Sequence, residues 1–153
     1  MRSTLPYLAI AFLLVWVTAK EGVAQSSGRK AIHAFVAADE QRKPRTRFSS
    51  DVPRIYACWK GQSLDVGDKI RAVWIAEDVG AASPKDTKIR DAEVQVFKTD
   101  ENGEVFLSRP TGQDWPLGRY RVEFYLNGSI LEVAKFTIEP GVQVETPVTG
   151  TPK

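Results

Sequence analysis

Residues 119–139 read RYRVEFYLNGSILEVAKFTIE, which is two runs of alternating apolar and polar residues on either side of Asn127-Gly128. Alternation with a period of two predicts strands that are buried on one face and solvated on the other. An Asn-Gly pair tolerates the positive φ angles of the type I′ turn that joins two antiparallel strands. Asn127-Gly128-Ser129 is also a glycosylation sequon, but the turn needs the same residues for backbone reasons and we favour the turn. The stretch therefore predicts a hairpin of strands 119–126 and 130–139.

The chain from residue 31 onward repeats this pattern of short apolar runs and turn residues. Runs rich in Val, Ile, Phe, Tyr and Trp are followed by Gly, Pro, Asn or Asp, and no stretch keeps helical spacing over a useful length. The further predicted strands are Ala31–Ala37, Arg54–Lys60, Lys69–Glu77, Ala92–Lys98 and Glu104–Ser108. Asp100–Glu104 predicts a hairpin turn rather than a calcium loop, because the other ligands of such a loop are missing. Short strands at this spacing are typical of an all-β sandwich or small barrel.

The N-terminal residues have the layout of an export signal. Arg2 precedes the uncharged, mostly apolar run 5–17, and Gly22-Val23-Ala24 supplies the small residues that a signal peptidase inspects. The run is shorter than the roughly 20 apolar residues that span a bilayer. We therefore expect a signal peptide over 1–24, and an exported protein of the periplasm or the extracellular space with no membrane insertion after cleavage. An uncleaved anchoring helix is the alternative.

The remaining chain divides into three parts. Residues 25–47 form an N-terminal segment with a first strand at 31–37 and a basic loop, and 48–139 form the core of the sandwich. The Pro- and Thr-rich tail, 140–153, is expected to be disordered.

The composition excludes several classes of protein. One Cys excludes a disulfide framework and any multi-cysteine metal site, and one His excludes the two- and three-histidine zinc sites. A net charge of +2 gives no case for a nucleic-acid partner. Cys58, between Tyr56 and Trp59, is expected to be buried and inert. We therefore expect no cofactor and no metal.

Candidate catalytic residues are few. Asp78, Asp86 and Asp114 are the carboxylates a hydrolase would use, but nothing in their spacing fixes the distance that paired acids need. Phosphate-binding loops and nucleophile motifs are absent from the sequence as well. We therefore expect a protein that is not an enzyme.

One segment carries a resemblance to a known family. Trp115–Val122 (WPLGRYRV) resembles the tyrosine corner of immunoglobulin-like and fibronectin-type sandwiches, and Trp74 lies mid-strand, where such domains bury a Trp. From about Ala31 to Glu139 the chain is similar to small immunoglobulin-like modules of exported bacterial proteins, many of uncharacterised function. The resemblance implies an immunoglobulin-like antiparallel β-sandwich of about seven to eight strands. The paired cysteines of antibody domains are missing, and no catalytic residue is implied.

The alternation also predicts which side chains face outward. If strands 69–77, 119–126 and 130–139 are neighbours in one sheet, their outer face gathers apolar side chains beside cations. This candidate partner surface consists of Arg71, Val73, Ile75, Arg119, Arg121, Tyr125, Val133 and Lys135. A protein or an acidic glycan would suit it. The alternative is that another part of the same chain covers it.

Two further features leave alternatives open. Trp115, in the loop before the tyrosine corner, either closes the end of the core or stacks on a sugar as a loop contact. Glu77–Ile89 is the longest predicted loop and could insert into an enzyme cleft.

The leading hypothesis is an exported, non-catalytic module that binds an envelope protein or a surface polymer. An immunoglobulin-like protease inhibitor and a structural accessory domain are the alternatives.

Overall fold

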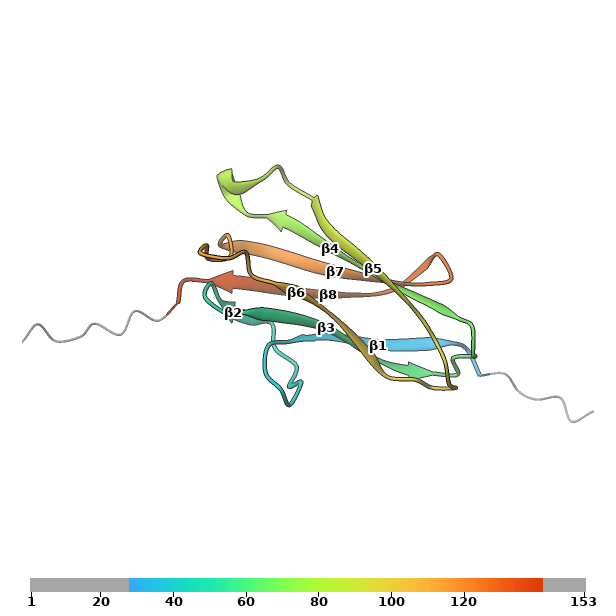
Figure 1. The fold of residues 1–153 in the computed structure, drawn as a ribbon. Coiled ribbons are helices and arrows are strands. Elements are labelled where there is room, and N and C mark those ends of the chain that lie inside the picture. The colour runs from blue at the N-terminus through green and yellow to red at the C-terminus, as the bar shows by residue number, and fades with distance from the viewer. Residues whose placement is uncertain (1–27, 142–153) are drawn as a thin grey trace, which may run out of the picture.

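The computed structural model describes residues 28–141, which form two β-sheets packed face to face (Figure 1). The strands are β1 (Ala31–Ala37), β2 (Arg47–Ser49), β3 (Arg54–Gln62), β4 (Lys69–Asp78), β5 (Thr87–Gln95), β6 (Gly103–Ser108), β7 (Gly118–Leu126) and β8 (Ser129–Glu139). A single 3-10 turn, Gly80–Ala82, lies between β4 and β5. One sheet has the order β1-β3-β6 and the other the order β2-β8-β7-β4-β5. Within residues 28–141 no helix is long and apolar enough to cross a membrane.

Strand pairing is antiparallel throughout, except that β2 runs parallel to β8. The predicted all-β sandwich is confirmed, and β1 has the predicted bounds. The predictions for residues 1–24 and for most of 140–153 lie outside the described residues.

One strand was predicted with the wrong bounds and one strand was not predicted. The strand expected at 92–98 is β5, which begins at Thr87 and ends at Gln95, so the long loop expected from Glu77 shrinks to 79–86. β5 is the outermost strand of its sheet and most of its residues are exposed, so its sequence lacks the apolar alternation that marks a half-buried strand. β2 was missed because it has only three residues.

The hairpin at the end of the sandwich has the predicted turn. Asn127 and Gly128 take φ angles of 49° and 87°, and the two residues alone connect β7 to β8. The Asn127 side chain accepts a hydrogen bond from the backbone N–H of Lys69 (2.9 Å) and donates one to Asp68 (2.8 Å). Both the oxygen and the nitrogen of this side-chain amide therefore form hydrogen bonds within the fold.

The segment expected to form a second hairpin connects the two sheets instead. Residues 96–102 lead from β5, which pairs with β4, to β6, which pairs with β3. Asp100 accepts a hydrogen bond from Leu64 N (3.3 Å), and Glu101 accepts one from Phe97 N (2.6 Å). Asp100–Glu104 correctly indicated a break between two strands, but turn residues do not reveal which sheet the next strand joins.

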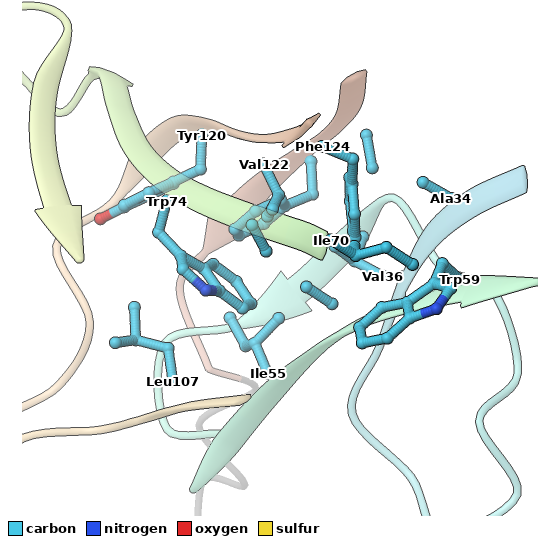
Figure 2. Packing of buried hydrophobic residues seen from close by; sticks show 14 of the residues in the cluster. Ala34, Val36, Ile55, Trp59, Ile70, Trp74, Leu107, Tyr120, Val122 and Phe124 are labelled. Atoms are coloured by element: carbon cyan, nitrogen blue, oxygen red, sulfur yellow. The ribbon is translucent and has the colours of Figure 1, made fainter. Parts of the chain in front are cut away.

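Aromatic side chains fill the space between the sheets (Figure 2). Trp59 of β3 meets Phe124 of β7 at 6.4 Å between ring centroids, edge to face, and Trp74 of β4 meets Phe136 in the same way at 6.3 Å. The inward residues predicted for β4 are all buried: Ile70, Ala72, Trp74 and Ala76. Cys58 is buried and unpaired. At the start of β6, Gly103 lies so close to Trp59 that a Cβ there would come within 2.2 Å of the indole ring.

The tyrosine corner is present at one end of the sandwich. The hydroxyl of Tyr120 donates to the carbonyl oxygen of Pro116 at 2.6 Å, and its ring stacks on Phe136 at 5.3 Å. Burial raises the pKa of Tyr120 to about 12, so the hydroxyl remains a donor at neutral pH.

Asp68 ties the opposite end together. Its carboxylate is buried and accepts hydrogen bonds from Lys30 (2.8 and 2.9 Å), Asn127 (2.8 Å) and Asp65 N (2.9 Å). Its backbone carbonyl accepts from Val96 N at 2.8 Å. Burial opposes ionisation, but the hydrogen bonds outweigh it and lower the pKa of Asp68. One residue thus connects the entry to β1 and the hairpin turn through its carboxylate, and the exit from β5 through its backbone carbonyl.

We expect Asp68→Ala to lower the free energy of unfolding by about 3 kcal/mol at pH 7, because removal of a buried acceptor leaves its donors unpaired. Since the folded-state pKa is lowered, the stabilisation is full above the unfolded pKa of about 4 and is lost as pH falls through the lower folded value. Urea denaturation of wild type and variant between pH 7 and pH 2 should show the two curves converging in acid. A difference in unfolding free energy between wild type and variant that stays constant with pH would contradict this role of the Asp68 carboxylate.

Candidate interaction surfaces

The first candidate surface is the predicted outer face of the five-stranded sheet. Strands β8, β7 and β4 are neighbours as expected. Val73 and Ile75 point to this face, but each is only 7% exposed, and Tyr125 is half-buried. Two of its expected apolar residues, Val73 and Ile75, are therefore covered by the chain itself.

Charged residues of an ion-pair network are the register partners of both on β7: Glu123 lies opposite Val73 and Arg121 opposite Ile75. Arg121 contacts Glu77 (3.4 Å), Asp86 (2.5 Å) and Glu123 (2.7 Å). The Tyr125 hydroxyl donates to Glu123 at 2.7 Å. The hydrogen bonds to Asp86 and Glu123 raise the pKa of the Arg121 guanidinium, so it stays charged. Asp86 comes from the loop 79–86, which brings that loop onto the sheet.

The other cations of this face are paired as well. Arg71 bonds to Asp91 on β5, Arg119 to Asp78 (3.0 Å), and Lys135 lies 3.3 Å from Glu77. Every cation that was predicted to bind a partner is therefore already paired with a carboxylate of the same chain. The positive charge expected on this face is largely neutralised. The compensating acids come mostly from β5 and the end of β4.

A small apolar group remains exposed at the start of β8. Ile130, Leu131 and Val133 are 52%, 42% and 38% exposed. The pairing of β7 with β8 shifts register between Phe124 and Tyr125, which places an extra residue on β8 at this point. Val133 is thus the apolar member of the predicted surface that is most open to solvent.

Trp115 is buried at the tyrosine-corner end. It is 6% exposed, and its indole N–H donates to the carbonyl oxygen of Val52 at 2.7 Å. Its backbone N–H donates to Ser50 O at 2.9 Å. This placement corresponds to the alternative in which Trp115 closes the end of the core, and leaves little of the ring for a sugar.

We expect Trp115→Ala to lower the free energy of unfolding by about 3 kcal/mol, because the substitution opens a cavity and frees a buried carbonyl. Trp115→Phe keeps most of the packing and should cost about half as much. Thermal unfolding followed by circular dichroism measures both. Unchanged stability in the Ala variant, together with loss of retention on a glycan column, would favour the sugar contact instead.

A second surface lies on the outer face of the three-stranded sheet, where the sequence analysis had placed no site. We call it the aromatic face: His33 and Phe35 on β1, Tyr56 on β3 and Phe106 on β6. Tyr56 and Phe106 are paired in register, with ring centroids 5.9 Å apart, and His33 and Phe35 are 6.2 Å apart. Phe106 is 44% exposed. Alternation on β1, β3 and β6 sends these rings outward because their neighbours fill the core.

Cations surround the aromatic face. The guanidinium of Arg42 lies 3.6 Å from the centre of the Tyr56 ring, and that of Arg54 lies 4.8 Å from the centre of the Phe106 ring. Arg42 also forms an ion pair with Glu104, whose pKa it lowers. In the part of the chain that the structure describes, Arg54 and Lys60 have no carboxylate within salt-bridge distance. The face therefore carries uncompensated positive charge.

A shallow cavity of about 370 Å³ opens on this face. Phe35, Arg42, Cys58, Lys60 and Glu104 are among the residues that line it. Burial raises the pKa of the Cys58 thiol to about 11, so the sulfur is protonated at neutral pH and a poor nucleophile.

The candidate catalytic carboxylates do not converge on this cavity. Asp78 pairs with Arg119, Asp86 with Arg121, and Asp114 with Arg109 (2.7 Å). The pKa of Asp78 is lowered, chiefly by the Gly80 N–H and by Lys85, whereas a general acid at neutral pH needs a raised one. Residues 28–141 contain no group of three or more His, Cys, Asp or Glu side chains that could hold a metal ion.

Comparison with solved structures assigns the fold. An immunoglobulin-like protein from Pseudomonas aeruginosa matches with a TM-score of 0.51 and 11% sequence identity, over 74% of this chain and 99% of that one. The fold is immunoglobulin-like. At this identity the likeness shows the fold alone. No protein-family model and no curated protein matches the sequence.

Parts of larger enzymes match less well. The alkylpurine DNA glycosylase of Pseudomonas fluorescens matches with a TM-score of 0.40 and 16% identity, over 72% of this chain and 30% of the enzyme. A β-glucosidase from Listeria innocua matches with a TM-score of 0.42 and 12% identity, over 72% of this chain and 16% of the enzyme. This chain spans less than a third of either protein, and neither match bears on its activity.

Proposed function

We propose that this immunoglobulin-like domain is an exported, non-catalytic interaction module that binds an acidic surface of an envelope protein through its aromatic face. The proposal rests on a difference between the two outer faces in how their cations are paired. On the five-stranded sheet, the cations of the predicted surface are paired with acids of the same chain. On the three-stranded sheet, exposed aromatic rings lie beside cations that remain available. Aromatic and arginine side chains are the residues that protein interfaces favour.

The geometry favours a protein over a surface polymer as the partner. A sugar ring stacks on the open face of an aromatic side chain, but guanidinium groups already lie over Tyr56 and Phe106. Arg42 is already bonded to Glu104, but Arg54 has no carboxylate within salt-bridge distance in residues 28–141, so its N–H groups can bind a partner's carboxylate. The same arrangement suits an acidic protein surface.

Export is part of the proposal and is supported by the sequence of residues 1–24 alone. A periplasmic or extracellular destination would bring the domain to envelope partners. The inhibitor alternative loses support because the loop 79–86 is short and Asp86 is tied to Arg121 on the sheet. A structural accessory domain would have no partner on the aromatic face.

A photo-crosslinking experiment in cells that export the protein tests the proposal. A photoreactive amino acid replaces Phe35 on the aromatic face in one variant and Val133 on the opposite sheet in the control, since both sites reach solvent. We expect a discrete adduct from position 35 that is absent at position 133. Lys60→Glu should reduce that adduct at least about fivefold, because a charge reversal costs about 1 kcal/mol or more at a complementary interface.

The absence of any adduct at position 35, or equal adducts at both positions, would overturn the proposed surface. An adduct that is made of polysaccharide rather than protein would overturn the choice of partner class.

A further inference from the structure

The two sheets present four strand edges, and three of them are protected. An exposed edge offers unpaired N–H and C=O groups to any other strand, so natural proteins shorten it, charge it, bend it or cover it. β1 is covered, because Val36 O accepts a hydrogen bond from Arg45 N (2.9 Å) and Ala34 N donates to Glu132 (2.8 Å). β2 has only three residues.

β5 is protected by charge and by an irregularity. Its sequence TKIRDAEVQ contains Lys88, Arg90, Asp91 and Glu93, all of them exposed. Its pairing with β4 shifts register between Trp74 and Ile75, which breaks the regular ladder that another strand would extend.

β6 has none of these protections. Its sequence GEVFLS contains no proline and one charged residue, Glu104, and it pairs with β3 without a register shift. The backbone groups on its other side have no hydrogen-bond partner among residues 28–141. Outward Phe106 and inward Leu107 alternate along it, so the strand keeps a regular pleat that another strand can match.

We propose that two copies of this chain pair through their β6 strands, antiparallel, with Phe106 on the two-fold axis. In this register Phe106 faces Phe106 of the second copy, Glu104 faces Ser108, and Val105 faces Leu107. The two three-stranded sheets then form one continuous sheet in the order β1-β3-β6-β6-β3-β1. The pairing is isologous, since each copy contributes the same surface.

The side chains of β6 fit a second copy. Phe106 is exposed, and Tyr56 lies next to it in register, so the dimer aligns four aromatic rings across the joined sheet. Directly opposite aromatic pairs stabilise antiparallel strands by up to about 1 kcal/mol.

The charges fit as well. Arg54 is the register partner of Ser108, so only the small Ser108 side chain lies between Arg54 and the position that Glu104 of the second copy would occupy. Arg54, which has no carboxylate within salt-bridge distance in residues 28–141, would come within reach of Glu104 of the second copy and share it with that copy's Arg42.

Sedimentation velocity of the protein, purified after expression of the full sequence, tests the pairing. We expect a dimer, and Phe106→Lys should weaken association at least about tenfold, because like charges would face each other at the axis. The matched control is Ile130→Lys, an equally exposed apolar residue on the other sheet, which should leave the dimer intact.

A cysteine at the axis provides a second test that does not depend on the stability of the Lys variant. Directly opposite residues have Cβ atoms about 5 Å apart, so Phe106→Cys should give a covalent dimer under copper-catalysed air oxidation. Val133→Cys should not, and Cys58 is buried and does not compete.

A monomer at all concentrations, a dimer unaffected by Phe106→Lys, or equal crosslinking at positions 106 and 133 would overturn the pairing. None of these results would bear on the adduct at position 35, since Phe35 lies on β1, away from the axis.

Discussion

Trp59 and Phe124 meet edge to face between the two sheets, and this contact joins β3 to β7. By chain order and sheet membership these two strands correspond to the pair that antibody domains connect with a disulfide. This chain has one cysteine, so packing must hold the layers together. The contact fixes the register of inward residues on both strands, because a shift by one residue would turn each ring to solvent. It also explains Gly103, where a larger residue would strike the Trp59 ring.

The shared core leaves two outer faces with different chemistry. On the five-stranded sheet, β5 and the end of β4 supply carboxylates to the cations of β4, β7 and β8, and the apolar residues below them are covered. Among residues 28–141 the three-stranded sheet gains no such added strand, and its rings and cations are open to solvent there. Because no further strand pairs with β6 in residues 28–141, β6 is also an unprotected edge of this sheet. The proposed binding face and the proposed dimer therefore have one structural origin.

Sequence patterns identified the parts of this structure that depend on burial of one strand face. The β7–β8 hairpin, the inward residues of β4 and the tyrosine corner were predictable because alternation and turn chemistry act locally. The ion pair between Arg71 and Asp91 was not, because it depends on where an exposed edge strand lies. The aromatic face was missed for a related reason: Tyr56 and Phe106 are distant in sequence and meet only when β3 and β6 pair. The signal was present in the outward positions of these strands, but only sheet order brings them together.

Packing between Trp59 and Phe124 thus takes the place that a disulfide between the sheets has in antibody domains. A double-mutant cycle with Trp59→Leu and Phe124→Leu, measured by urea denaturation, tests it directly. Each single change should lower the free energy of unfolding by about 1 to 3 kcal/mol, and the double variant should lose about 1 kcal/mol less than the sum of the two. Additive losses would show that the two rings stabilise the sheets independently, and would contradict the account.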